Sequence, residues 1–173
     1  IRFNPQTSQH RIVKRGNAPS KAQPAFAHRN LPLLLLQARE RVIARFRPLL
    51  NANGVTEQQW RVLRALIETG PLEPRQIVAL CGISSPSLAG VLARMEEVGL
   101  VRRVRLDHDQ RRVEVSLTAK SRALAAAMAP QVEAAYAELE AMVGAELVGE
   151  AYRVLDRLVN ALDTEPDPGD EQV

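Results

Sequence analysis

The segment from Glu73 to Leu117 most constrains the fold, because a helical pattern changes there into a strand pattern. Two short helices are predicted first, one between Glu73-Pro74 and Cys81-Gly82 and one from Pro86 to Val98. About three residues join them, which is the spacing of a helix-turn-helix. The sequence VRRVRLDHDQRRVEVSLT follows, and its second half alternates apolar and polar residues, as a strand with one exposed face does. We therefore predict a helix-turn-helix followed directly by a two-stranded hairpin.

A long helix is predicted before this segment. Asn30 suits an N-cap and Pro32 suits a first turn, so the helix should run from Leu31 to about Asn51, with Pro48 bending or ending it. Its apolar band is wider than one small core needs, and part of the band is expected to contact another chain. The band consists of Leu33, Leu34, Leu36, Val42, Ile43 and Phe46.

Three more helices complete the pattern. A capping-box pattern beginning at Thr56 opens a helix that runs through residues 60–68. After the hairpin, Thr118 suits the cap of an alanine-rich helix to about residue 143, bent or interrupted near Pro130. A last helix is predicted over residues 145–162.

The helix from Pro86 to Val98 has one apolar face and one small or cationic face. The apolar face consists of Leu88, Val91, Leu92 and Met95, and the opposite face carries Ser87, Gly90 and Arg94. Ser84 or Ser85 suits its cap, and Pro86 suits its first position. A mid-helix glycine costs about 1 kcal/mol relative to alanine, and close approach to a groove wall would justify that cost. Packing of Gly90 against a neighbouring helix is the alternative.

A two-stranded ribbon directly after a helix-turn-helix would be a wing, and this one is rich in arginine. The five arginines expected beside a DNA backbone are Arg102, Arg103, Arg105, Arg111 and Arg112. Arg111 would lie at the tip, where a narrow and negative minor groove favours an inserted guanidinium, and Asp109 is placed to orient it. The alternative is a solvated surface whose arginines pair with Glu96, Glu97 and Asp107.

The residues as a whole resemble the MarR-type winged-helix transcriptional regulators, and among them the repressors of homoprotocatechuate (4-hydroxyphenylacetate) degradation operons. The resemblance rests on NLPLLLLQARERVIARFRPLL, TEQQWRVLRAL, LEPRQIVALCGISSPSLAGVLARMEEVGLVRR and DQRRVEVSLT, and the D-x-R signature of the wing matches at Asp109 and Arg111. It implies a mainly α fold with a small hairpin wing. It also implies an intertwined helical homodimer, a recognition helix in each major groove and an aromatic acid as effector. Ala89 stands where relatives are expected to carry a hydroxyl residue, so the operator sequence stays open.

Charge is sorted towards the two ends of the chain, although the formal net charge is only +3. Residues 1–30 carry Lys and Arg without Asp or Glu, which favours a nearby polyanion, and a solvated tail is the alternative. Few aromatic residues are present, which favours duplex over single-stranded nucleic acid. We divide the chain into a basic arm (1–30), a helical dimerisation region (31–52 and 119–162), a winged helix-turn-helix lobe that binds DNA (53–118) and an acidic flexible tail (163–173).

The predicted function is a ligand-responsive transcriptional repressor that binds a pseudo-palindromic duplex operator as a homodimer and controls an aromatic-acid catabolic operon. The predicted DNA-binding residues are Ser84, Ser85, Pro86, Ser87, Gly90, Arg94, Arg103, Arg105, Asp109, Arg111 and Arg112. Of these, Ser85, Ser87 and Arg94 are expected in the major groove, on phosphates or base edges.

A phenolic carboxylate is the effector that the resemblance implies. Such a ligand needs a cation, a polar partner and an apolar wall. Arg39 is predicted to hold its carboxyl group, with His28 and Arg29 at the start of the first helix and Trp60 as the wall. The alternatives are that Arg39 pairs with Glu40, that Trp60 is sealed in the core and that His28 is solvated.

Other classes of protein are disfavoured by the residues present. No catalytic motif surrounds His10, His28 or His108, so we expect no enzyme, no cofactor and no metal site. Cys81 is expected to be a small buried thiol, although a redox-sensing regulator is an alternative, and a helical dimerisation module without DNA binding is another. No apolar run is long enough for a bilayer and no signal-peptide pattern opens the sequence, so we expect a cytoplasmic protein without a membrane partner.

Overall fold

The computed structural model describes residues 26–106 and 109–163. The side chains of Leu106 and of residues 109–111 are likewise not described. The predictions for most of the basic arm, for nearly all of the acidic tail, for Asp107 and His108, and for the side chains of Asp109 and Arg111 therefore lie outside the described residues.

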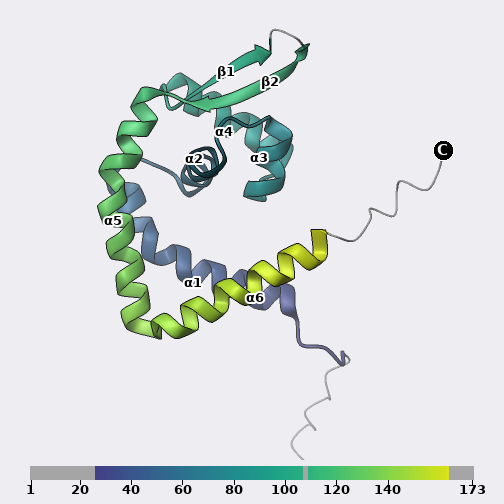
Figure 1. Ribbon diagram of the computed structural model, residues 1–173, viewed down its shortest axis with the longest axis vertical. Coiled ribbons are helices and arrows are strands. Elements are labelled where there is room, and N and C mark those ends of the chain that lie inside the picture. Colours follow the sequence, from purple (N-terminus) through teal and green to yellow (C-terminus); the bar gives the residue numbers. More distant parts are fainter. Residues whose placement is uncertain (1–25, 107–108, 164–173) are drawn as a thin grey trace, which may run out of the picture.

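Helices dominate the structure, and one hairpin interrupts them. The elements are α1 (Leu31–Ala52), α2 (Glu57–Thr69), α3 (Pro74–Cys81), α4 (Ser85–Glu97), β1 (Val101–Leu106), β2 (Asp109–Leu117), α5 (Ala119–Val143) and α6 (Ala145–Asp163). The helices α2, α3 and α4 form one lobe below the hairpin, and α5 leads from this lobe to α6 (Figure 1). The predicted fold, mainly α with a small hairpin wing, is confirmed.

Side chains at the helix starts make the hydrogen bonds that the sequence predicted. The Asn30 side chain accepts from the Leu33 N–H at 3.0 Å. Thr56 and Gln59 form a reciprocal capping box, with bonds of 2.9 and 3.2 Å. The Thr118 hydroxyl accepts from the Ser121 N–H at 3.2 Å. These bonds satisfy N–H groups that have no partner within the helix.

Two prolines lie inside helices that continue past them, Pro48 in α1 and Pro130 in α5. The expectations that Pro48 ends its helix and that Pro130 interrupts its own are wrong. Both prolines are exposed, so water can bond to the carbonyl group that each one leaves without its usual partner. Buried residues on the other side of each helix, such as Phe46 and Val132, hold the helix in place.

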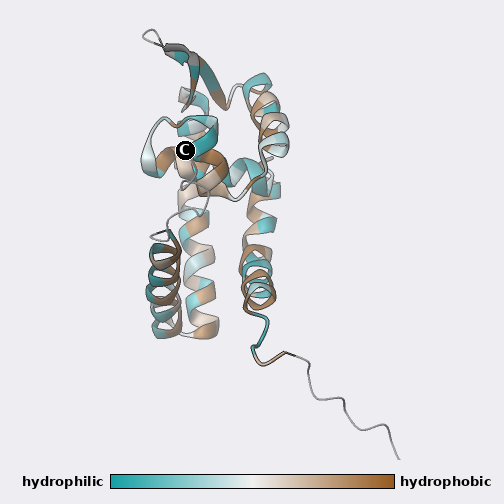
Figure 2. Ribbon diagram, turned by 90° about the vertical axis from the view of Figure 1, so that its right-hand side faces the viewer, coloured by the Kyte–Doolittle hydropathy of each residue, from teal (hydrophilic) through white to brown (hydrophobic). Residues whose placement is uncertain are grey.

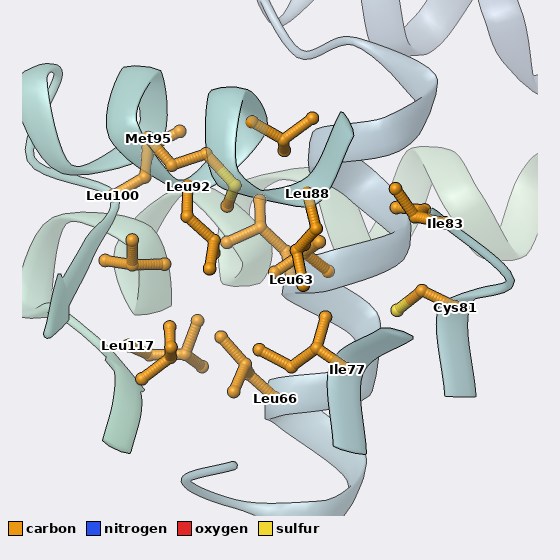
Figure 3. Packing of buried hydrophobic residues seen from close by; sticks show 14 of the residues in the cluster. Leu63, Leu66, Ile77, Cys81, Ile83, Leu88, Leu92, Met95, Leu100 and Leu117 are labelled. Carbon is orange, nitrogen blue, oxygen red and sulfur yellow. The ribbon is translucent and has the colours of Figure 1, made fainter. Parts of the chain in front are cut away.

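The main hydrophobic core lies between α2, α3, α4, the base of the hairpin and α5 (Figure 3). Leu63, Ile77 and Met95 are completely enclosed in it. All four residues of the predicted apolar face of α4 are buried, which confirms that face. Because α4 is fixed in the core on this side, its opposite face is directed away from the lobe.

The hairpin is antiparallel, with Val101 opposite Leu117 and Arg103 opposite Val115, and its register shifts between Arg105 and Leu106. Its base joins the lobe through the backbone, because Leu72 and Val115 exchange hydrogen bonds of 3.0 and 2.8 Å. Val115 and Leu117 are buried, as the alternation predicted. The rest of the hairpin projects from the lobe (Figure 1).

Large apolar side chains are exposed on α1 and α6. In α1 these include Leu33, Leu34, Leu36 and Val42, four members of the predicted wide band. No residue of α6 is buried, although one side of the helix is apolar (Figure 2). The large apolar residues of α6 that are exposed are Leu147, Tyr152, Val154, Leu155, Val159 and Leu162. Within one chain, these surfaces lack the cover that apolar faces of this size usually have.

In the described part of the chain, no helix is by itself long and apolar enough to cross a bilayer. Only α3 and α4 taken together reach the required length and composition, and they meet at 111°.

Candidate nucleic-acid interface and effector cavity

The outer face of α4 presents small and cationic residues to solvent. Ser85, Pro86, Ser87 and Arg94 are all exposed. Ser84 occupies the N-cap position, but its hydroxyl donates to the Ser87 hydroxyl at 2.9 Å and makes no side-chain cap bond. The first N–H groups of α4 therefore have no side-chain cap, and free N–H groups at a helix start suit a phosphate.

Gly90 lies on this outer face, and no other helix packs against it. A β-carbon added there would meet only the Nη1 atom of Arg94 within 4 Å, at 3.5 Å. The alternative of helix packing at Gly90 is therefore not observed among the residues that the structure describes. The backbone of α4 is open to close approach from outside.

The hairpin arginines whose side chains are described are exposed, and two of these have acidic partners. Arg103 binds Glu96 of α4, with its Nε atom 2.8 Å from Oε2. Arg112 binds Glu73, the residue before α3, with its Nε atom 2.9 Å from Oε1. The sequence suggested the pair with Glu96 but not the pair with Glu73. Both pairs lie within the chain, so these two arginines contact other parts of the protein in addition to their predicted contact with DNA. Arg105 is exposed as well.

A cluster of ion pairs joins α1 to α2 and to the turn of the helix-turn-helix. Glu57 accepts from Arg39, from Arg47 at 3.3 Å and from Arg61 at 3.1 Å. Burial opposes ionisation of Glu57, but these arginines outweigh it and lower the pKa of its carboxyl group. Arg61 also donates to the carbonyl oxygen of Cys81 at 2.6 Å, at the end of α3.

Arg39 is occupied by this cluster. It pairs with Glu40 at 2.5 Å as well as with Glu57, so the alternative considered for Arg39 is observed. It lines an open hollow beside Leu36 and Arg61, and Trp60 does not line that hollow. Nor do His28 and Arg29, which precede α1 and are exposed, line any cavity described here. The structure therefore does not bring the four predicted effector residues together.

A different set of residues surrounds Trp60. A cavity of about 280 Å³ between α1, α2 and α5 is lined by Val42, Ile43, Phe46, Trp60, Arg61, Arg64, Glu68, Val132 and Tyr136. Trp60 is half-buried, and the Arg64 guanidinium lies 6.0 Å from the centre of its ring. Phe46 and Tyr136 meet edge to face, with ring centres 4.8 Å apart. A cation, a phenol and aromatic walls thus meet in one place.

Burial is the main cause that raises the pKa of Tyr136, and Tyr152 of α6 adds to it. Its hydroxyl therefore remains protonated at neutral pH and can donate a hydrogen bond. Sequence reasoning missed Arg64 and Tyr136. Arg64 lies one helical turn after Trp60, a spacing that places two side chains on one face, and Tyr136 is the single aromatic residue of α5. Both features are visible in the sequence. Neither indicates a cavity, because the cavity depends on how α1, α2 and α5 pack together.

Cys81 is buried beneath this region. The residue is 4% exposed, and burial raises the pKa of its thiol. It donates a long hydrogen bond of 3.6 Å to the Arg61 carbonyl oxygen. A buried thiol with a raised pKa holds little thiolate at neutral pH, which disfavours the redox-sensing alternative.

A helix-turn-helix with an attached hairpin, flanked by long helices with exposed apolar faces, defines a winged helix-turn-helix protein of the DNA-binding class. The chain belongs to the MarR family, whose model matches residues 53–112. It is 38% identical over 132 residues to the homoprotocatechuate degradative operon repressor of Escherichia coli, covering 76% of this chain and 89% of that protein. The family consists of transcriptional regulators rather than enzymes, and its members bind DNA as dimers.

Solved structures of regulators resemble the fold over most of its length. NadR in complex with 4-hydroxyphenylacetate has a TM-score of 0.69 and 35% identity, covering 82% of this chain and 97% of NadR. The transcriptional repressor CouR, bound to a 23-mer DNA duplex, has a TM-score of 0.67 and 25% identity, covering 75% of this chain and 92% of CouR.

Proposed function

We propose that this protein is a dimeric repressor of an aromatic-acid catabolic operon, and that a phenolic carboxylate bound beside Trp60 releases it from a pseudo-palindromic operator. The observation that carries the proposal is the cavity between α1, α2 and α5. It joins Trp60, Arg64 and Tyr136 at the junction of the predicted dimerisation helices and the DNA-binding lobe.

The outer face of α4 is the proposed major-groove surface. Ser85, Ser87 and Arg94 are exposed there, and the open backbone at Gly90 permits close approach. In a dimer, two such helices should lie about 34 Å apart, one turn of duplex. Arg111 remains the residue predicted for the minor groove. The likeness to CouR, which was solved on a DNA duplex, supports this assignment.

A second copy of the chain is the proposed cover for the exposed apolar faces of α1 and α6. Both faces lie within residues 31–52 and 119–162, which the sequence predicts as the dimerisation region. Residues 53–118 then form the DNA-binding lobe. The wide apolar band of α1 and the absence of buried residues on α6 support this division.

The cavity suits an aromatic ring that carries an acid at one end and a hydroxyl group at the other. Arg64 supplies a cation, the protonated Tyr136 hydroxyl supplies a donor, and Trp60 and Phe46 supply aromatic walls. We assign the carboxylate clamp to Arg64 in place of Arg39, because Arg64 lines this cavity and Arg39 does not. Among the described residues, Arg64 pairs with one acid, Glu68, which a ligand carboxylate would have to displace, whereas Arg39 pairs with both Glu57 and Glu40. The likeness to NadR, solved with 4-hydroxyphenylacetate, supports the ligand class.

Release requires that the ligand bind more tightly to the dimer spacing that misfits DNA than to the spacing that fits it, because equal affinity for both would shift nothing. The cavity lies where such a difference would arise, since its walls come from α1 and α5 on one side and from α2 on the other. Its occupation would bias the position of the lobe against the dimerisation helices.

Titration with hydroxylated phenylacetates, cinnamates and benzoates tests the proposal while duplex binding is followed by fluorescence anisotropy. The duplex is one enriched from a randomised library by the parent protein. We expect at least one acid to weaken binding, and we expect Arg64→Ala to abolish that response. Arg122→Ala is the matched control, because Arg122 lines the neighbouring hollow between α2 and α5 but not this cavity. Unchanged duplex affinity at saturating acid would contradict the effector assignment.

A further inference from the structure

Glu96 makes an unusually complete set of contacts with the first strand of the hairpin. It lies near the end of α4 and accepts from the Arg103 backbone N–H at 3.1 Å, from Nε at 2.8 Å and from Nη2. The hydrogen bonds from Arg103 lower the pKa of the Glu96 carboxyl group, against the effect of burial, so Glu96 is ionised at neutral pH. One carboxylate therefore holds both the backbone and the side chain of β1.

Glu73 holds the second strand in a similar way. It occupies the N-cap position of α3, and it accepts from Nε of Arg112 at 2.9 Å and from Nη2 of the same residue. The neighbouring residue, Leu72, is the one that exchanges backbone hydrogen bonds with Val115 of β2. Each strand of the hairpin is thus attached to a different helix of the helix-turn-helix, β1 to α4 and β2 to α3.

Two attachments on opposite strands restrict the hairpin more than one does. A hairpin held only at its base can swing, whereas attachments to α3 and α4 set its direction relative to both helices. In each pair, the Nε and Nη2 atoms of the guanidinium both donate to one carboxylate oxygen, Oε2 of Glu96 or Oε1 of Glu73. Two bonds from one guanidinium restrict its position more than a single bond would. The wing is the projecting element in Figure 1, and these attachments set its direction relative to α3 and α4.

We infer that Glu73 and Glu96 are positioning residues for the wing, and that Arg103 and Arg112 serve them rather than DNA phosphates. This inference rests on the proposed DNA-binding function. The two ion pairs hold the wing at the angle at which its tip meets the duplex while α4 occupies the major groove. Arg103 and Arg112 then make structural contacts within the protein. Exposed arginines that do not hold the wing, such as Arg94, remain available to bind DNA.

The same ion pairs could instead shield the arginines from DNA. The two roles predict opposite changes in DNA affinity when an acidic partner is removed. If Glu96 merely shielded Arg103 from DNA, removal of the acidic charge would release a cation to a phosphate. Binding would strengthen, and the slope of log affinity against log salt would steepen by about 0.9 for each new phosphate contact. If Glu96 positions the wing, its loss weakens binding and does not steepen the slope, because contacts of the wing with DNA are lost and none is gained.

The test compares Glu96→Gln with Glu97→Gln. Glu97 is the neighbouring exposed residue of α4 and loses the same charge in its variant, so the comparison cancels the general effect of charge near DNA. Binding is measured by anisotropy over a range of salt concentrations, on the enriched duplex and on a shuffled duplex of equal length. We expect Glu96→Gln to bind the enriched duplex about twofold to fivefold more weakly than Glu97→Gln does, with a salt slope that is no steeper.

Further variants complete the design. Glu73→Gln should repeat the loss through the other strand, and Arg103→Ala should lower affinity to the same extent and with the same salt slope as Glu96→Gln does. Hydrogen exchange in the absence of DNA should be faster at the hairpin amides of Glu96→Gln and unchanged in α2. Stronger or steeper binding by Glu96→Gln, affinity equal to that of Glu97→Gln, or unchanged hairpin exchange would each overturn the inference. Failure of the parent to bind any duplex would instead refute the proposed function, and the exchange measurement would still decide whether Glu96 positions the hairpin.

Discussion

Gly90 lowers the stability of helix α4 but leaves its backbone open to close approach. Glycine inside a helix destabilises it by about 1 kcal/mol relative to alanine, and the space beside Gly90 would accept a β-carbon with one ordinary contact, to Arg94. Nothing in the described part of the chain therefore explains the glycine. The explanation that remains is a surface outside the chain that approaches the α4 backbone.

Gly90→Ala is accordingly expected to change two properties in opposite directions. Thermal or urea unfolding should show a gain of about 1 kcal/mol in the free energy of unfolding. Affinity for the enriched duplex should fall, because the added methyl group meets the groove wall. A variant that is more stable and binds the duplex as tightly as the parent would remove Gly90 from the interface.

Glu57 concentrates charge at the junction of α1 and α2. Its folded pKa is lowered by three arginines, so its ionisation stabilises the folded state. This contribution is complete above the pKa that Glu57 has in the unfolded chain, and it is lost as the pH falls through the lower folded pKa. Comparison with Glu57→Gln isolates the contribution, because the variant has no charge to lose.

We expect Glu57→Gln to be less stable than the parent by about 1 kcal/mol at neutral pH, the upper range for partly exposed pairs. The difference should shrink as the pH falls below the ordinary range of a glutamate and should vanish below the folded pKa. Urea denaturation of both proteins over a series of pH values measures it. A difference that does not vary with pH would show that shape, rather than charge, is what the substitution removes.

At the scale of elements, the sequence predicted helix caps and buried helix faces well, but it did not predict which charged side chains pair across the fold. The caps at Asn30, Thr56 and Thr118 are set by residues three positions apart, and the buried stripe of α4 follows from helical spacing. Each of these depends on a few neighbouring residues. Sequence patterns of this length carry enough information to place helix starts and the inner faces of helices.

The partners of charged side chains depend on the fold instead. Arg112 and Glu73 are 39 positions apart, so nothing local indicates their pairing. Arg39 was predicted to bind an acid of the effector, but Glu57, which lies 18 positions away, occupies it. For a related reason, neither proline ends its helix, because exposure on the finished helix decides whether water replaces the missing hydrogen bond, and a bend at each proline stays a prediction.

Helix α6 is the element that depends most on something outside its own chain. Leu155 is 43% exposed on its apolar side, while Asp156 lies next to it in sequence on the polar side. We expect Leu155→Asp to convert a dimer into monomers in analytical ultracentrifugation, because a charge would have to be buried in the apolar interface. Asp156→Ala should remain dimeric. A dimeric Leu155→Asp protein would exclude this face from the interface.

At the scale of the whole molecule, association and folding should be coupled. Apolar surface on α1 and α6 stays exposed in a single chain, and its burial against a second copy would add stability that depends on concentration. The thermal midpoint of the parent should therefore rise with protein concentration, as measured by circular dichroism. The midpoint of Leu155→Asp should be lower and should not change with concentration. A parent midpoint that is independent of concentration would contradict the coupling.

The exposed apolar helices and the outer face of α4 lie in separate parts of the chain, and this separation has a consequence for inheritance. In the proposed dimer, a copy with a defective wing or a defective α4 keeps α1 and α6 and should still pair with intact copies. In a cell that makes both kinds equally, random pairing leaves only about a quarter of the dimers with two working lobes, given the two-fold symmetry of a dimer. Alleles that damage α4 or the hairpin should therefore be dominant over the intact allele, whereas alleles that destroy the apolar face of α6 should be recessive.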